Sequence, residues 1–300
     1  MIGLTGGTGF IGSYLSRGLP NLKRLVRDPD KANRKHDLIG NIANHADLEA
    51  FLPQTECLIH LASVNYPRNS NRDFLADLQM NLLPNVYLFE RYAQLNPKGH
   101  LIFASSGGAL YDPALPQIPR REDDPLKPWS AYGIQKQASE AFLRLISARD
   151  GLKVSCLRIS NPYGTVLPTQ RGQGLVGIAI STALQGSELP IYGDSGVIRD
   201  YLHLSDLERA VAHCIASPPP ETTPYRVLNI GSGRGYTVNQ VLQEISSALG
   251  KSMKTRQVPV EGLGSDWNIL DISRAKTVLD WEPRMELGEG IRRTVAEITS

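Results

Sequence analysis

Apolar and polar positions alternate regularly over the first 160 residues of the chain. Short apolar runs of strand length are separated by longer segments that have helical periodicity and few helix breakers. The apolar runs are residues 2–5, 22–26, 57–61, 101–104 and 154–158, and the helical segments are residues 47–52, 73–94 and 130–149. This alternation predicts an α/β fold in which helices cover both faces of a doubly wound parallel sheet.

The pattern is looser after residue 162. Residues 164–196 are rich in Gly, Pro, Ser and Thr, and predict a loop-rich region. Ser205 and Thr237 each stand three positions before a Glu or Gln, which is the spacing of a capping box at the start of a helix. The predicted elements are helices at 205–216 and 237–250 and a strand at 227–230.

The length of 300 residues favours two joined domains over one small domain. We expect a first α/β domain over residues 1–160 and a smaller α/β lobe over residues 161–300 that binds the substrate. Within the second region, residues 200–232 are expected to pack back onto the first sheet.

The composition, with 41% hydrophobic and 21% charged residues, is that of a soluble globular protein. The formal net charge of +2, without a long Lys/Arg run, argues against a nucleic-acid or membrane partner, and no apolar run reaches the roughly 20 residues of a membrane span. Cys57, Cys156 and Cys214 lie far apart in apolar segments, which predicts buried reduced thiols and a cytoplasmic protein. The six histidines lack metal-ligand spacing, so we predict no metal.

A glycine-rich turn follows the first predicted strand. Gly6, Gly9 and Gly12 have the spacing of a strand-to-helix turn that binds the pyrophosphate of a dinucleotide. Glycine removes the side chains that would block the phosphates, and the helix that begins near Phe10 and Ile11 offers free N–H groups to them. The turn predicts a Rossmann-type dinucleotide site.

The second predicted strand, residues 22–26, leads directly into Arg27 and Asp28. The Asp28 carboxylate is suited to the two hydroxyl groups of an adenosine ribose, which favours NAD. Arg27 is suited to a 2′-phosphate instead, so NADP stays open as the alternative.

Tyr132 and Lys136 lie four apart in a predicted helix and therefore on one face of it. A tyrosine that acts as a base near neutral pH needs its pKa lowered by about 3 units, or roughly 4 kcal/mol. A neighbouring ammonium and a cationic oxidised nicotinamide both favour the phenolate. The helix follows a strand that ends in Ser105 and Ser106, where a substrate oxygen can be bound.

These motifs, in this order, resemble the extended short-chain dehydrogenase/reductase family, and most closely its nucleotide-sugar epimerases of the UDP-glucose 4-epimerase type. The resemblance covers nearly the whole chain. The segments that carry it, besides the glycine turn and the Tyr-x-x-x-Lys pair, are residues 59–62, Asn81, and residues 103–111, 158–164, 193–201, 229–233 and 280–283. By this resemblance, the cofactor is also contacted by Leu61, Ala62, Asn81 and Ile159.

The resemblance also implies a mechanism and a substrate, a nucleoside-diphosphate sugar. Tyr132 would take the proton from the 4-hydroxyl while hydride passes to NAD, and hydride would return to the other face of the transient 4-keto sugar. Lys136 would hold the cofactor ribose and lower the pKa of Tyr132. Ser106 would hydrogen-bond the same sugar oxygen. Asn161 and Arg199 would bind the diphosphate.

Two positions depart from the family pattern. Counting back from Tyr111, the position of the catalytic Ser or Thr is occupied by Gly107, so we assign the serine role to Ser106 and a substrate contact to Gly107. Gly107 and Gly108 also replace the Asp-Glu pair of the family's dehydratases, which sets a dehydratase aside. The interval from Gly12 to Asp28 is shorter than the usual roughly 20 residues.

Three readings follow from these residues. The leading one is an NAD-dependent epimerase. The alternatives are an NADPH-dependent 4-keto-sugar reductase, favoured by Arg27, and a non-catalytic dinucleotide sensor, suggested by Gly107. The resemblance further implies a homodimer formed through the helices at 73–94 and 130–149.

Overall fold

The computed structural model describes residues 1–53, 55–64, 71, 73–165, 174–259 and 265–299. Its contacts group the chain into two compact units. Unit 1 contains residues 1–110, 128–158 and 211–228, and unit 2 contains residues 111–127, 159–210 and 229–300. The predicted boundary at residue 160 stays a prediction, because compactness alone does not report which segments fold independently.

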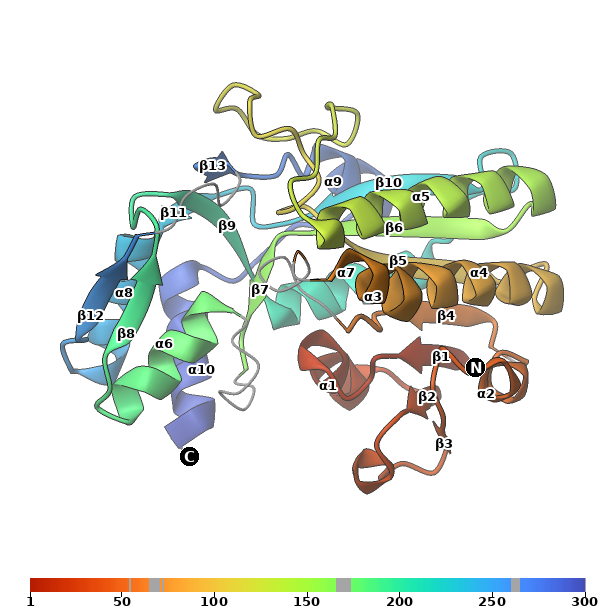
Figure 1. Ribbon diagram of the computed structural model, residues 1–300, viewed down its shortest axis with the longest axis horizontal. Helices are drawn as coiled ribbons and strands as arrows, with labels where there is room; N and C mark the ends of the chain where they lie inside the picture. Colours follow the sequence, from red (N-terminus) through yellow and green to blue (C-terminus); the bar gives the residue numbers. More distant parts are fainter. Residues whose placement is uncertain (54, 65–70, 72, 166–173, 260–264, 300) are drawn as a thin grey trace. The chain divides into compact units, whose positions relative to one another are not determined.

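Unit 1 is built on a seven-stranded sheet (Figure 1). In spatial order the strands are β10 (Tyr225–Ile230), β6 (Lys153–Ile159), β5 (His100–Ser106), β4 (Cys57–His60), β1 (Ile2–Thr5), β2 (Leu22–Val26) and β3 (Asp37–Ile39). β1 pairs in parallel with β2 on one side and β4 on the other. The strand order therefore reverses beside β1, and in such sheets ligands bind at the carboxyl ends of the strands at this point.

The helices of unit 1 cover both faces of its sheet, which confirms the predicted doubly wound fold. They are α1 (Phe10–Gly18), the short η1 (Pro29–Lys31), α2 (His45–Phe51), α3 (Phe74–Asp77), the π-helical turn η3 (Leu78–Leu82), α4 (Leu83–Leu95) and α5 (Ala131–Asp150). α2, α4 and α5 share one buried core with the strands, and Figure 1 shows α4 and α5 side by side. Val154 and Cys156 belong to that core, so Ser155 faces the opposite side of the sheet. There it contacts Arg226, which in turn reaches Cys214.

Unit 2 has a smaller mixed sheet and a helical layer. β9 (Ile198–His203) pairs in parallel with β7 (Asn161–Tyr163) and β13 (Trp267–Asn268), and antiparallel with β11 (Gly235–Thr237). A separate parallel pair is formed by β8 (Leu189–Tyr192) and β12 (Thr255–Val258). The helices are α6 (Leu175–Leu184), α8 (Val238–Leu249), α9 (Ser273–Leu279) and α10 (Leu287–Thr299), while α7 (Leu204–Ala216) begins in unit 2 and its last residues belong to unit 1. Side chains of α6, α8 and α10 form its main apolar core.

Two local predictions in unit 2 are wrong. The prediction of a loop-rich region over residues 164–196 misses α6 and β8. α6 is apolar on most of its surface, so it lacks a clear helical periodicity, and glycines flank it. Residues 166–173 of this region lie outside the described residues. Ser205 does not cap α7, which begins one residue earlier at Leu204. The His203 Nδ1 atom accepts from the Ser205 N–H instead.

Other local predictions are confirmed. Thr237 and Gln240 form the predicted capping box of α8, and Gly250 ends that helix in the left-handed conformation. Cys57, Cys156 and Cys214 are free and buried, and burial raises the pKa of each thiol. No described helix is both long and apolar enough to cross a bilayer.

Candidate active site

The glycine turn between β1 and α1 is shaped to receive a group close to the backbone. Gly6 has φ +73°, and a Cβ atom there would lie 2.7 Å from the Ala62 nitrogen. A Cβ at Gly12 would lie 2.1 Å from the carbonyl oxygen of Gly6. Gly9 caps α1 without a side-chain bond, which leaves N–H groups of the first turn, near Phe10 and Ile11, available. These features fit the pyrophosphate of a dinucleotide.

At the end of β2, the Asp28 carboxylate accepts from the Asp30 N–H at 3.2 Å and forms an ion pair with Lys31 at 2.9 Å. The hydrogen bond from Lys31 is the main cause that holds the pKa of Asp28 below its usual value. Arg27 is exposed. Both residues predicted to choose between NAD and NADP therefore lie at this strand end, and Lys31 adds a second cation beside them.

The sequence reading missed an ion pair below the glycine turn. Arg24 donates to both carboxylate oxygens of Asp37, at 2.8 and 2.5 Å, and both side chains are buried. The Arg24 chain packs against Gly7, where a Cβ would lie 2.8 Å from its Cδ atom. A single arginine at a core-facing position of a predicted strand is the signal that indicates such a pair.

The other predicted cofactor contacts lie after β4 and at the end of β6. Leu61 donates its N–H to Thr5, and Ala62 lies beside Gly6. Asn81, in the π-helical turn, accepts from the Val64 N–H at 2.8 Å. Ile159 is buried at the end of β6.

Tyr132 and Lys136 lie in the first turns of α5, whose start is capped by Ser130. The Tyr132 and Ser106 hydroxyl groups are hydrogen-bonded. The Lys136 Nζ donates to the Ala104 carbonyl at 2.7 Å and lies 5.6 Å from the centre of the Tyr132 ring. The three residues predicted to be catalytic thus lie where the end of β5 meets the start of α5.

The protonation of this pair is set mainly by burial. Burial raises the pKa of Tyr132 to about 12, although the Ser106 hydrogen bond lowers it. Burial lowers the pKa of Lys136 to about 8, although Glu140 raises it. The protein alone therefore keeps Tyr132 protonated at neutral pH, which differs from the lowered pKa that a base requires. A cationic nicotinamide beside the ring would favour the phenolate.

Buried hydrogen bonds between side chains connect the strands behind the site to α5. Thr5 Oγ1 contacts His60 Nδ1 at 2.7 Å, and His60 Nε2 contacts Asn85 Oδ1 at 2.8 Å. Asn85 donates to Ser139 of α5. Burial lowers the pKa of His60 to about 4, so its ring stays neutral at pH 7. His60 lies in the strand predicted over residues 57–61, and the sequence gave no sign of these partners.

The residues predicted to bind the diphosphate lie in unit 2. Asn161 is in β7, where its amide donates to the Asp200 carbonyl at 2.8 Å. Arg199 is in the neighbouring strand β9, and its guanidinium donates to the Ile198 carbonyl. Burial lowers the pKa of Arg199. The register pairs Asn161 with Tyr201, so the two predicted residues belong to adjacent strands.

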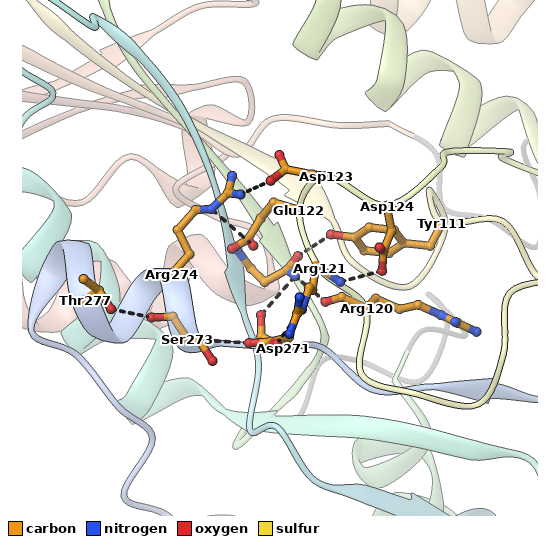
Figure 2. Close-up of polar contacts among 11 residues, drawn as sticks. Tyr111, Arg120, Arg121, Glu122, Asp123, Asp124, Asp271, Ser273, Arg274 and Thr277 are labelled. Atoms are coloured by element: carbon orange, nitrogen blue, oxygen red, sulfur yellow. Dashed lines mark hydrogen bonds and ion pairs between the residues drawn. The ribbon is translucent and has the colours of Figure 1, made fainter.

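A polar cluster in unit 2 fixes the loop that follows the serine segment (Figure 2). We call Tyr111, Arg120, Glu122, Asn229 and Asp271 the Asn229 cluster. Tyr111 donates to the Asn229 Oδ1 at 2.6 Å, and the Asn229 N–H donates to Glu122 at 2.8 Å. Figure 2 labels the other four members of the cluster. The Asn229 amide donates to the carbonyl oxygens of Arg120 and Asp271, at 2.7 and 3.1 Å. Three separate chain segments are joined at this point.

Comparison with known proteins assigns the chain to a family. It matches the model of the NAD dependent epimerase/dehydratase family over residues 2–231. A dTDP-4-dehydro-6-deoxyglucose reductase of Escherichia coli is 30% identical over 312 residues, with 98% of this chain and 96% of the relative covered. The chain belongs to the NAD-dependent epimerase/dehydratase family, as the sequence predicted.

Solved structures agree with this assignment. The UDP-glucose 4-epimerase of Thermotoga maritima with UDP-glucose is similar at a TM-score of 0.89 and 30% identity, over 99% of this chain and 98% of that one. The UDP-glucose 4-epimerase of Thermus thermophilus in complex with NAD is similar at a TM-score of 0.87 and 26% identity, over 100% of this chain and 99% of that one. The chain is therefore an enzyme of this family that modifies a nucleoside-diphosphate sugar.

Proposed function

We propose that the protein is an NAD-dependent epimerase of a nucleoside-diphosphate sugar that acts through a transient 4-keto intermediate. The observation that carries the proposal is the contact of Tyr132 with Ser106 and Lys136 at the start of α5. Gly107 and Gly108 follow directly and add no second acid or base. One proton-transfer group suffices for epimerisation, whereas a dehydratase needs further acid and base groups.

The proposed roles follow from these contacts. Bound NAD supplies the hydride acceptor and donor. The Tyr132 hydroxyl exchanges the proton of the sugar 4-oxygen, and the Ser106 hydroxyl, which is bonded to it, orients the same oxygen. The Lys136 ammonium favours the tyrosinate by charge. Arg199 of β9 is suited to paired contacts with phosphate oxygens.

A second candidate is an NADPH-dependent 4-keto-sugar reductase. The observation that favours it is at the end of β2, where the Asp28 carboxylate is occupied by Lys31 and the Asp30 N–H, and Arg27 is exposed beside it. A ribose 2′-phosphate would have two cations to bind. The raised pKa of Tyr132 also suits a group that donates a proton to a keto oxygen.

The test is the identity and fate of the dinucleotide. The purified protein is denatured and any released dinucleotide is identified. Stoichiometric NAD or NADH, with turnover of a UDP-sugar and no net reduction, supports the epimerase. An empty protein that binds NADPH more tightly than NADH, and that reduces a 4-keto sugar nucleotide, supports the reductase.

Substitution of the tyrosine tests both candidates. Tyr132→Phe is expected to lower kcat by at least about 100-fold, the typical contribution of a positioned proton-transfer group, and to leave dinucleotide binding intact. Wild-type protein that binds the dinucleotide but turns over no sugar nucleotide would support the sensor instead.

We also propose a homodimer formed through α3, α4 and α5. These helices pack on one another and expose large apolar side chains. The exposed residues are Phe74, Leu75, Leu78, Met80, Leu83, Ile134, Phe142 and Leu145. Large exposed apolar side chains on helices that pack together are typical of a protein interface. Leu145, which is 63% exposed, is the position to test: Leu145→Asp is expected to give a monomer by light scattering, whereas Leu184→Asp on α6 of unit 2 is not.

A further inference from the structure

Glu140 and Lys136 are two buried charges on one face of α5. They are four residues apart, so their side chains lie about one helical turn from each other. Lys136 is 3% exposed and Glu140 is 5% exposed. Burial of such charges is costly unless opposite charges and hydrogen bonds compensate them. The partners of Glu140 therefore bear on the charge of Lys136.

The Glu140 carboxylate is held from two strands. Its Oε1 accepts from the Ser105 hydroxyl of β5 at 2.5 Å and from Arg158 Nε of β6 at 3.1 Å. Its Oε2 accepts from Arg158 Nη2 at 2.7 Å. Arg158 is 4% exposed, so this is a buried two-point ion pair. The ion pair joins the third turn of α5 to β6, and the Ser105 hydroxyl joins the same turn to β5, the strand that carries Ser106.

Lys136 has a neutral acceptor as its direct partner, the Ala104 carbonyl. The balance of its charge depends on the groups around it. Those groups are Tyr132 and Glu140 on α5, Asp77 on α3, His60 on β4, and Cys156 and Arg158 on β6. Glu140 is the largest of the influences that raise the pKa of Lys136. Arg158 limits that influence, because it neutralises the same carboxylate.

We propose that Glu140 and Arg158 are a positioning pair whose two opposed charges set the charge of Lys136 at neutral pH. The role rests on the proposed function, in which the Lys136 ammonium supports proton transfer by Tyr132. Neither residue touches the reacting atoms in this assignment. The pair acts through Lys136, with the carboxylate favouring its ammonium form and the guanidinium opposing it.

We expect the pKa of Lys136 to shift in opposite directions when the charge of Glu140 or that of Arg158 is removed. Glu140→Gln leaves a buried cation near Lys136 and is expected to lower its pKa by about 1 unit or more. Arg158→Gln leaves a buried anion and is expected to raise the pKa by a similar amount. The double variant removes both charges and should return the pKa close to the wild-type value. Ser105→Ala removes a neutral donor from the same carboxylate and should shift the pKa much less.

The titration of Lys136 is measured by NMR of protein labelled with ¹³C-lysine, with the signal assigned by its loss in Lys136→Met. The high-pH limb of kcat/KM is measured for the same variants and should move in the same direction as the pKa. A pair that only braces the fold would lower stability in both single variants without opposite titration shifts. The proposal is overturned if the pKa of Lys136 shifts in the same direction in both single variants, or in neither.

The NMR titration and the activity test different statements. Opposite shifts with no turnover of any sugar nucleotide uphold the positioning pair and overturn the proposed function. Turnover that Tyr132→Phe abolishes, with no titration shift in the Glu140 and Arg158 variants, overturns the positioning pair and upholds the proposed function. If Glu140→Gln does not fold, the Arg158→Gln and double variants still decide the sign.

Discussion

Buried polar side chains are satisfied in different ways in the two units. In unit 1 they bond mainly to other side chains, as in the chain Thr5–His60–Asn85 behind the candidate active site. In unit 2 they bond mainly to the backbone. Asp200 accepts from the N–H groups of Ser232, Gly233 and Leu270, and Asp206 accepts from those of Arg284 and Met285.

The difference follows from the backbone that surrounds these groups. In unit 1 they lie on strands and helices whose own N–H and C=O groups are already paired, so side chains must find one another. In unit 2 they lie beside loops with unpaired N–H groups, and a carboxylate can satisfy several at once. Networks between side chains therefore adjust charge near a reacting group, whereas networks to the backbone fix the paths of loops.

The largest effect is expected for a carboxylate bonded to the backbone. Asp200 is 0% exposed, and Asp200→Ala leaves the N–H groups of Ser232, Gly233 and Leu270 without their acceptor. Buried donors cost about 1–3 kcal/mol each when left unpaired, so we expect a loss of at least about 3 kcal/mol in the free energy of unfolding. Urea denaturation measures it.

The control is Asp194→Ala, because Asp194 also accepts from a backbone N–H, that of Gly196, but lies in a more exposed loop. Its loss should be below about 1 kcal/mol, as for exposed polar contacts in general. Equal losses in the two variants would contradict the view that buried backbone contacts carry the stability of these loops.

The next effect depends on pH and is expected for the side-chain network of unit 1. The pKa of His60 is lowered from 6.5 to about 4 by burial, so stability is present above pH 6.5 and is lost as the pH falls toward 4. The loss is about 3 kcal/mol over that window. In His60→Asn the free energy of unfolding should depend less on pH between 6.5 and 4. Guanidinium denaturation at several pH values measures this dependence.

His36→Asn is the matched control, because His36 is exposed. It should keep the pH dependence of the wild type. A His60→Asn variant with an unchanged slope would mean that the ring is protonated in the folded protein at these pH values, which its buried contacts oppose.

The smallest effect is expected within the Asn229 cluster, for the bond from Tyr111 to the Asn229 side chain. Tyr111→Phe removes one donor and leaves the other bonds of the amide in place, so about 1 kcal/mol of stability should be lost. Tyr87→Phe removes a weaker, part-buried bond to Glu49 at 3.3 Å and should cost less. Thermal denaturation measures both losses of stability. A loss in Tyr111→Phe no larger than that in Tyr87→Phe would contradict a stronger hydrogen bond in the Asn229 cluster.

The sequence predicts most of the sheet of unit 1 well, because most of its strands are short runs in which apolar residues prevail. The bounds of β1 and β2 agree with the prediction at both ends, since each strand is followed by a glycine or charged turn. β3 was missed, because Asp37 begins it and its side chain belongs to the ion pair with Arg24. β7 and β9 were missed because polar residues such as Asn161 and Arg199 occupy them.

For the candidate site, the glycine turn and the Tyr132–Lys136 pair are readable because a fixed spacing along one element carries them. The contact between Ser106 and Tyr132 is not, because it depends on how the end of β5 meets the start of α5. The sequence assigned the serine role to Ser106, although counting back from Tyr111 places Gly107 at that position, and this assignment stays a prediction. The ion pair of Arg158 could not be predicted either, because its partner Glu140 lies in another element.

The three buried thiols allow the unfolding of unit 1 to be followed by the rate at which they are labelled. Cys57, Cys156 and Cys214 all belong to unit 1, and their raised pKa values keep them unreactive while it is folded. Trp267 and Trp281, in contrast, are buried in unit 2. Trp129 belongs to unit 1, so the comparison uses Trp129→Phe. In that variant the rate of thiol labelling follows the unfolding of unit 1, while tryptophan emission follows that of unit 2. Coincident transitions would mean that both units unfold as one cooperative body, and a lag would give the order in which they open.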